Sequence, residues 1–223
     1  MSRNYISGRY NSAIAKVHAV GVALKSAAQW LADEGFVTLS PADELPSIAT
    51  FVSGEMIKGN WWSHARANEI YNLFQKLSSS PNVVVLKLID GKVTLVHKRL
   101  WPPLLRLVTD SEQRTKRLKK LNPAARMLLD QVETHGSVRM DFIADEMGGN
   151  RKALKKSRDL LERLCLVASR DEHTRDGHHE AVLETWPTIM KRKSIRIPKS
   201  LTVEAALSAF EEKLGKHRIP FSM

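Results

Sequence analysis

The strongest constraint on the fold lies in residues 121–187, where helix-ending and turn-forming residues divide the chain at short intervals. Asn122-Pro123 is a typical helix start, because the asparagine side chain caps the first turn and proline needs no N–H partner there. Gly136 is a typical stop for the same helix. Asp176-Gly177 is a hairpin turn signal between two strand-like runs.

Between these signals the apolar residues predict an order of helix, short strand, helix, helix, strand and strand. The short strand is 137–139, and the second helix opens at Met140 or Asp141 and ends at Gly148-Gly149. The residues expected inside on the first two helices are Ala124, Met127, Leu128, Val132, Phe142, Ile143 and Met147. Asn150 caps the third helix, whose apolar face is Ala153, Leu154, Ser157, Leu160, Leu161 and Leu164.

This order of elements resembles the winged helix-turn-helix fold over about residues 120–187. The resemblance implies that the third helix enters the major groove of DNA and that the final hairpin, the wing, touches the flanking backbone or minor groove. The basic residues agree with that implication, because they precede the first acid of the third helix and recur on the wing. The predicted DNA contacts are Arg151, Lys152, Lys155, Lys156 and Arg158 on the helix, and Arg170 and Arg175 on the wing.

Two other interpretations of this half stay open. The basic helix face could be a solvated surface on a domain that contacts proteins. The histidines in "HTRDGHH", residues 173–179, suggest a metal site, but a hairpin tip alone rarely supplies all four ligands. We therefore expect no metal and no cofactor.

The basic segment 109–121 reads as the domain boundary, either as a helical spacer or as a linker along phosphates. We expect a helical domain with a β-hairpin at 1–110, the winged helix with this linker at 111–187, and a basic strip plus helix at 188–223. Lys191, Arg192 and Lys193 of the strip are further predicted DNA contacts. Pro198 argues against a helix through the cluster 191–200, and Thr202 is the expected cap of the last helix.

The first half is predicted to hold a helix at 12–34, a helix beginning near Ser63, and a hairpin at 83–98 around Asp90-Gly91. Residues 45–107, with a Trp-Trp-x-His stretch before "GKVTLVH", resemble a group of uncharacterised bacterial proteins. That resemblance implies no particular reaction.

The stretch Trp61-Trp62-Ser63-His64 supports three interpretations. Ser63 caps the helix and the tryptophans anchor it in the core. Alternatively, a tryptophan is an exposed platform for an unpaired base, with Lys87 among the cations around it. In the third, His64 is a catalytic acid or base, although no nucleophile spacing or metal set supports it.

The net charge of +11 and the pI of about 9.9 favour a polyanionic partner. No apolar run reaches the roughly 20 residues that span a bilayer, so we expect no membrane contact and a cytoplasmic protein. The single cysteine, Cys165, reads as a core residue.

The sequence therefore predicts an α+β, mostly helical protein that binds double-stranded DNA without catalysis, in transcriptional control. Binding of single-stranded DNA and homodimerisation stay open. The alternatives are a DNA-processing or repair enzyme that uses the Trp61-Trp62-Ser63-His64 region, and a protein-interaction adaptor.

Overall fold

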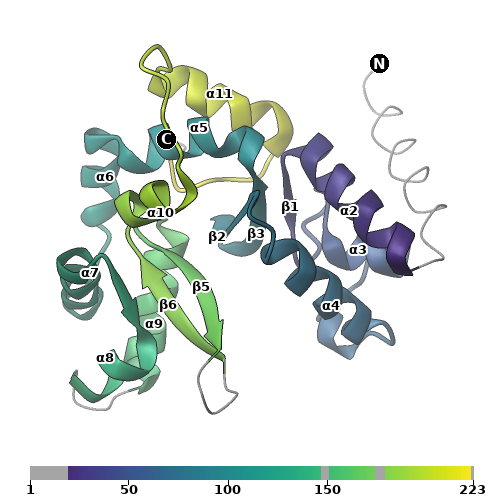
Figure 1. Ribbon diagram of the computed structural model, residues 1–223, viewed down its shortest axis with the longest axis horizontal. Coiled ribbons are helices and arrows are strands. Elements are labelled where there is room, and N and C mark those ends of the chain that lie inside the picture. The colour runs from purple at the N-terminus through teal and green to yellow at the C-terminus, as the bar shows by residue number, and fades with distance from the viewer. Residues whose placement is uncertain (1–19, 147–150, 174–178, 222–223) are drawn as a thin grey trace. The chain divides into compact units, whose positions relative to one another are not determined.

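The computed structural model describes residues 20–146, 151–173 and 179–221 (Figure 1). The fold is α+β and mostly helical, as expected, with 56% helix and small antiparallel sheets. The chain forms two compact units: unit 1 comprises residues 1–84 and 93–100, and unit 2 comprises 85–92 and 101–223.

This division differs from the predicted boundaries at 110 and 187. Helix α5 (Trp101–Thr109) packs against α11 (Val203–Leu214), so the segment before 110 and the tail both join unit 2. The tail is thus part of the second core and does not stand as a separate segment.

Unit 1 is built from helices around the end of a sheet with strand order β1-β3-β2. Its elements are α2 (Val20–Glu34), β1 (Phe36–Thr38), α3 (Ile48–Ser53), the 3-10 helix η1 (Trp61–Ser63), α4 (Ala67–Ser78), the start of β2 (Val83–Ile89), most of β3 (Lys92–His97) and the 3-10 helix η2 (Lys98–Leu100). Helix α4 packs against α2 and α3. Trp30 of α2 stacks on Phe51 of α3 with ring centroids 4.5 Å apart, which closes the helical layer. The first part of the predicted helix 12–34 lies outside the described residues.

The turn between β2 and β3 has the predicted hairpin geometry. Asp90 and Gly91 both have positive φ, 49° and 70°, which is the conformation that a two-residue hairpin turn requires. The turn is held by the C-terminal segment, because Asp90 Oδ2 lies 2.6 Å from His217 Nδ1 and Asp90 N donates to Arg218 O at 3.0 Å. Residues 85–92 therefore belong to unit 2.

Unit 2 contains the remaining elements. They are α5, α6 (Ser111–Leu118), α7 (Pro123–His135), β4 (Ser137–Arg139), α8 (Met140–Glu146), α9 (Arg151–Arg163), β5 (Ala168–His173), β6 (His179–Glu184), α10 (Trp186–Lys193) and α11. Asn122 caps α7 as predicted, its side chain accepting from Ala125 N at 2.8 Å. Thr202 caps α11 in the same way at 3.1 Å.

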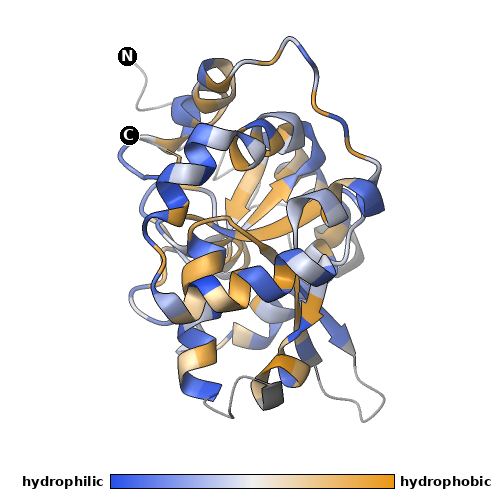
Figure 2. Cartoon of the chain, turned by 90° about the vertical axis from the view of Figure 1, so that its left-hand side faces the viewer, coloured by the Kyte–Doolittle hydropathy of each residue, from blue (hydrophilic) through white to orange (hydrophobic). Residues whose placement is uncertain are grey.

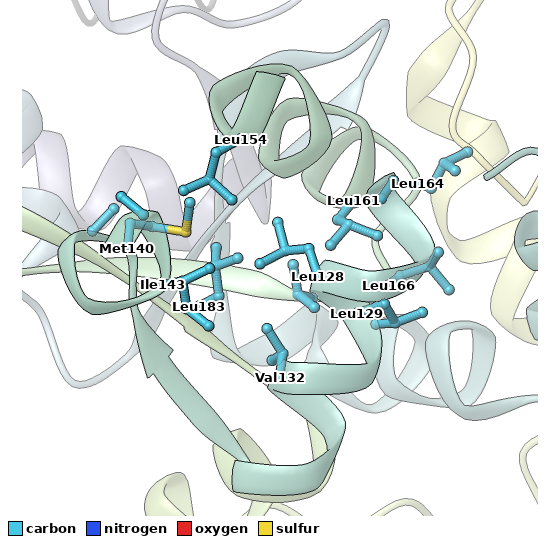
Figure 3. Packing of buried hydrophobic residues seen from close by; sticks show 14 residues of the cluster. Leu128, Leu129, Val132, Met140, Ile143, Leu154, Leu161, Leu164, Leu166 and Leu183 are labelled. Carbon is cyan, nitrogen blue, oxygen red and sulfur yellow. The ribbon is translucent and has the colours of Figure 1, made fainter. Parts of the chain in front are cut away.

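The three strands of this unit pair in the antiparallel order β4-β6-β5. Leu183 of the central strand lies opposite Val138 on one side and Ser169 on the other. Its side chain points into the core with leucines from α7 and α9, which Figure 3 shows meeting over the sheet. In Figure 2 the helices show hydrophilic and hydrophobic residues in turn along their length. Helix burial of this kind is what the apolar spacing predicted.

Two residues expected inside the second core are exposed. Met127 on α7 is 59% exposed, because Ala125, Leu128 and Val132 take the buried positions and leave it on the outer side. Phe142 on α8 is 60% exposed, and the Arg139 guanidinium lies 4.4 Å from its ring centroid. This cation–π contact covers part of the ring that the core does not bury.

The predicted linker is helix α6, and one of its basic residues is buried. Arg117 is 1% exposed and donates to carbonyls at the ends of two helices: Val108 and Leu107 of α5, and Leu164 and Cys165 after α9. Burial lowers the pKa of this guanidinium to about 10, so it remains protonated at neutral pH. Carbonyls at helix C-termini carry partial negative charge, which offsets the buried cation.

Cys165 is fully buried, as expected for a core cysteine. Burial raises the pKa of its thiol to about 12, so the reactive thiolate form is suppressed. Its carbonyl oxygen accepts from both Arg117 Nη1 and Trp186 Nε1, each at 2.8 Å. The ends of α6 and α9 and the start of α10 therefore meet at one point.

Candidate nucleic-acid interface

The first two turns of α9 carry several exposed basic residues of the predicted interface. Four of them are exposed and form no ion pair with another described residue: Arg151, Lys152, Lys155 and Lys156. Leu154 and Leu161 on the opposite side of the helix are buried in the core. The core therefore fixes which face of α9 points outward, and this face is basic.

Arg158, the fifth basic residue expected at this surface, is used differently. Its Nε atom lies 2.9 Å from Glu162 Oε1, and Glu162 is only 4% exposed. The spacing of four residues along a helix brings these side chains together. Arg158 thus neutralises a buried carboxylate and is not presented with the other four.

The second half of α9 is also held by the tip of the β2–β3 hairpin. Lys87 Nζ lies 2.6 Å from both Asp159 Oδ1 and Glu162 Oε2. Lys87 was expected to supply charge beside the tryptophans, but its ammonium is engaged with these two acids. Burial alone would raise the pKa of Asp159, but the hydrogen bond and charge of Lys87, with the charge of Arg163, lower it below the ordinary value.

We expect Lys87→Met to lower the free energy of unfolding by about 1–2 kcal/mol, because Glu162 would keep only one of its two cationic neighbours. Chemical denaturation at pH 7 measures this loss, with Lys98→Met, at an exposed lysine of η2, as the control. Asp159 has a lowered folded-state pKa, so its contribution is present above the ordinary value of 3.8 and is lost as the pH falls below it. The difference between wild type and variant should therefore narrow below this pH, and a pH-independent difference would contradict the assignment.

The basic residues of the wing are less available for contact with DNA than the sequence suggested. Arg170 of β5 lies 2.8 Å from Glu172 and 3.5 Å from Glu184, which is 4% exposed. Its charge is therefore largely compensated within the sheet. Arg175 lies outside the described residues.

The basic strip after the sheet forms the last turn of α10, a helix that the sequence interpretation missed. Thr185 caps this helix and Pro187 stands in its first turn, which together form a helix-start signal. The signal was missed because Trp186 and Pro187 were assigned to the end of the wing. Arg192 holds Glu184 at 2.6 Å, and Lys193 Nζ lies 5.0 Å from the ring centroid of Trp101. Burial lowers the pKa of the Lys193 ammonium. Only Lys191 of the three predicted contacts is exposed and without an ion pair to another described residue.

The tryptophan stretch of unit 1 forms the 3-10 helix η1, and Ser63 does not cap the following helix. Asn60 caps η1 by accepting from Trp62 N at 3.0 Å, and α4 begins only at Ala67. Ser63 lies inside the 3-10 turn, too early in the chain to reach the amides of α4.

The two tryptophans have opposite environments. Trp61 is 4% exposed and anchors η1 in the core, whereas Trp62 is 57% exposed. The rings stack at 4.0 Å, and Trp62 also lies 5.5 Å from the ring of Tyr71 on α4. Of the two, Trp62 alone has an aromatic face on the surface, and its neighbours hold that ring in place.

The surroundings of His64 give little support to a catalytic role. Its Nδ1 atom accepts a hydrogen bond from Arg66 N at 3.1 Å, and its Nε2 atom lies 3.6 Å from Glu55 Oε1. The lone pair that a general base needs is therefore occupied by a backbone amide. Glu69, an acid in the first turn of α4, is paired with Arg66 at 2.6 Å.

Charge is divided unequally between the two units. Unit 2 contains 26 Lys and Arg against 18 Asp and Glu, whereas unit 1 contains nine against six. Three of those nine, Arg3, Arg9 and Lys16, precede residue 20. Most of the net charge of +11 thus lies in unit 2.

No protein-family model, curated protein or solved structure matches this chain. The likeness of residues 45–107 to uncharacterised bacterial proteins therefore stays a prediction. Within the described part of the chain, no helix is both long and apolar enough to cross a bilayer. The same part contains no group of three potential metal ligands, while the side chains of the wing histidines lie outside it.

Proposed function

We propose that this protein binds double-stranded DNA through the first two turns of α9, in a winged-helix arrangement. The observation that supports this proposal most directly is the set of four exposed basic residues on the outward face of α9, Arg151, Lys152, Lys155 and Lys156. In helix-turn-helix proteins the N-terminal part of the second helix of the motif reads base edges in the major groove.

The architecture of unit 2 supports the proposal. Its elements from α7 to β6 follow the winged-helix order, and the sheet order β4-β6-β5 brings the short first strand beside the last one. The excess of basic residues in unit 2 also favours a polyanionic partner.

Duplex binding measured by fluorescence anisotropy at several salt concentrations tests this function. If the four exposed cations in the first two turns of α9 each contact a phosphate, log K should fall with log salt with a slope of about −3.6 or steeper. Absence of duplex binding at about 50 mM salt, where phosphate contacts are strongest, would overturn the proposal and favour a protein-interaction adaptor.

A second proposal concerns unit 1, where Trp62 would stack on an unpaired base. Its exposed face is supported from behind by Trp61, and stacking of this kind tolerates any base. From residue 20 onward unit 1 carries six basic and six acidic residues, so such binding would depend mainly on stacking.

We expect Trp62→Ala to weaken binding of a single-stranded oligonucleotide by about 1–2 kcal/mol, with almost no change in the salt slope. Trp62→Phe, which keeps an aromatic face, should restore most of the affinity. Duplex affinity should be unaffected by either change. Equal single-strand affinity for wild type and Trp62→Ala would exclude the stacking proposal.

A further inference from the structure

A second group of exposed cations lies in unit 2, at the other end of the β4-β6-β5 sheet from the start of α9. Helix α10 follows β6 after one residue, and Thr185 N and Thr188 Oγ1 both donate to Gly136 O, at 2.9 and 3.0 Å. Trp186 Nε1 binds the carbonyl of Cys165, just beyond the end of α9. The start of α10 is thus fixed beside the C-terminal end of α9.

The basic residues from 191 to 199 divide into anchors and exposed cations. Arg192 binds the buried Glu184, and Lys193 is half-buried against Trp101, so both tie α10 to unit 2. The exposed members, none paired with another described residue, are Lys191, Arg196 and Lys199.

The chain after α10 presents these cations in a fixed direction. Ser194 ends the helix with φ of 53°, and Ile195 N donates to Met190 O at 3.0 Å. Ile195 and Ile197 are then half-buried while Arg196 is exposed, the alternation of an extended segment with one face against the protein. No acidic residue occurs between 185 and 203.

The end of α6 adds two more exposed lysines to this region, Lys119 and Lys120. Arg117, two residues before Lys119, shares the Cys165 carbonyl with Trp186 of α10. The sequence from 113 to 129 also contains no acid.

The separation of the two basic surfaces follows from the length of α9. Its 13 residues span about 20 Å, and its C-terminal end adjoins the start of α10 while its exposed cations occupy the N-terminal end. Figure 1 shows α10 at the end of β5 and β6 that is remote from α8 and from the start of α9. A straight duplex held by the start of α9 would leave the α10 surface open to another phosphate backbone.

We propose that Lys191, Arg196 and Lys199, with Lys119 and Lys120, bind a second segment of duplex DNA, so that one molecule bridges two duplexes. This inference rests on the proposed function, because it assumes that α9 holds the first duplex. The partner is a phosphate backbone, since the surface offers separated point charges without an acid among them.

A bridging assay with the full-length protein tests the proposal. One duplex is fixed to beads, protein is added, and capture of a second, labelled duplex is measured at about 150 mM salt. The triple variant Lys191→Ala, Arg196→Ala, Lys199→Ala should bind the fixed duplex with unchanged affinity. Its capture of the labelled duplex should fall about 100-fold, the expected loss for three phosphate contacts.

The controls separate this inference from the proposed function. Wild type that binds no duplex at all would refute the function itself. Wild type that binds the fixed duplex but captures no second one, or a triple variant that captures it normally, would overturn the bridging inference alone. Analytical ultracentrifugation of the triple variant checks that any loss of capture does not arise from a changed oligomeric state. Lys25→Ala, Lys58→Ala, Lys76→Ala removes the same charge from exposed lysines of unit 1 and should leave capture unchanged.

Discussion

Replacing Arg117 with methionine is expected to lower the free energy of unfolding by about 3–5 kcal/mol. The guanidinium joins α6 to the ends of α5 and α9 through carbonyls of Val108, Leu164 and Cys165 at 2.8–3.0 Å. Its removal would leave the carbonyls of Val108 and Leu164 without this donor, whereas the Cys165 carbonyl keeps Trp186 Nε1. Each such loss costs about 1–3 kcal/mol. Natural domains have only about 5–15 kcal/mol of stability, so the variant would be close to unfolding.

The measurement is urea denaturation followed by circular dichroism. Arg114→Met is the matched control, because Arg114 lies on the same helix but forms an exposed ion pair with Glu133 at 2.5 Å. Such pairs contribute about 0–1 kcal/mol. Arg117→Lys should lie close to Arg117→Met, since one ammonium cannot reach carbonyls on both sides of the site. A loss below about 1 kcal/mol for Arg117→Met would show that the carbonyls find other donors.

Alanine at Lys152, Lys155 and Lys156 is expected to weaken duplex binding about 100-fold at 150 mM salt. Each lost phosphate contact retains about 0.9 of a counterion on the DNA, so the log–log salt slope should become shallower by about 2.7. Stability should stay within about 0.5 kcal/mol of wild type, because all three side chains are exposed on the outward face of α9.

Anisotropy titrations at several salt concentrations measure both effects together. The unit 1 variant Lys25→Ala, Lys58→Ala, Lys76→Ala removes the same number of charges and should keep the affinity and the slope. An equal loss for both triple variants would indicate a nonspecific effect of net charge. Unchanged affinity in the α9 variant would refute its role as the contact helix.

The local signals in the sequence predicted the elements well. The Asn122-Pro123 start, the Thr202 cap and the Asp90-Gly91 turn are all present, because capping and turn conformations depend on a few neighbouring residues. Two local signals were misread. The start of α10 at Thr185 was hidden within a run of strand-forming residues, and Ser63 lies inside η1 and does not cap α4. The side of each helix that enters the core was predicted less reliably, since Met127 and Phe142 are exposed.

For the candidate site, prediction from the sequence met a different limit. The sequence indicated where basic residues gather, but every cation in a cluster looks alike until its neighbours are known. Arg158, Arg170, Arg192 and Lys193 are engaged by Glu162, Glu184, Glu172 or Trp101, while the first four basic residues of α9 are not paired with described residues. Arg196 and Lys199 were within a recognised cluster, yet nothing in the sequence distinguished them from Arg192.

By itself the sequence determined the basic character of the second half, the order of the helices and strands between residues 121 and 184, and the residues that start α7 and α11. These properties follow from composition and from interactions within a few residues. Only the tertiary structure decided that Arg117 is buried, that Lys87 holds α9, and that Trp62 rather than Trp61 faces outward. Each of these depends on contacts between distant segments, which determine whether a charge or ring meets water, a carbonyl or another side chain.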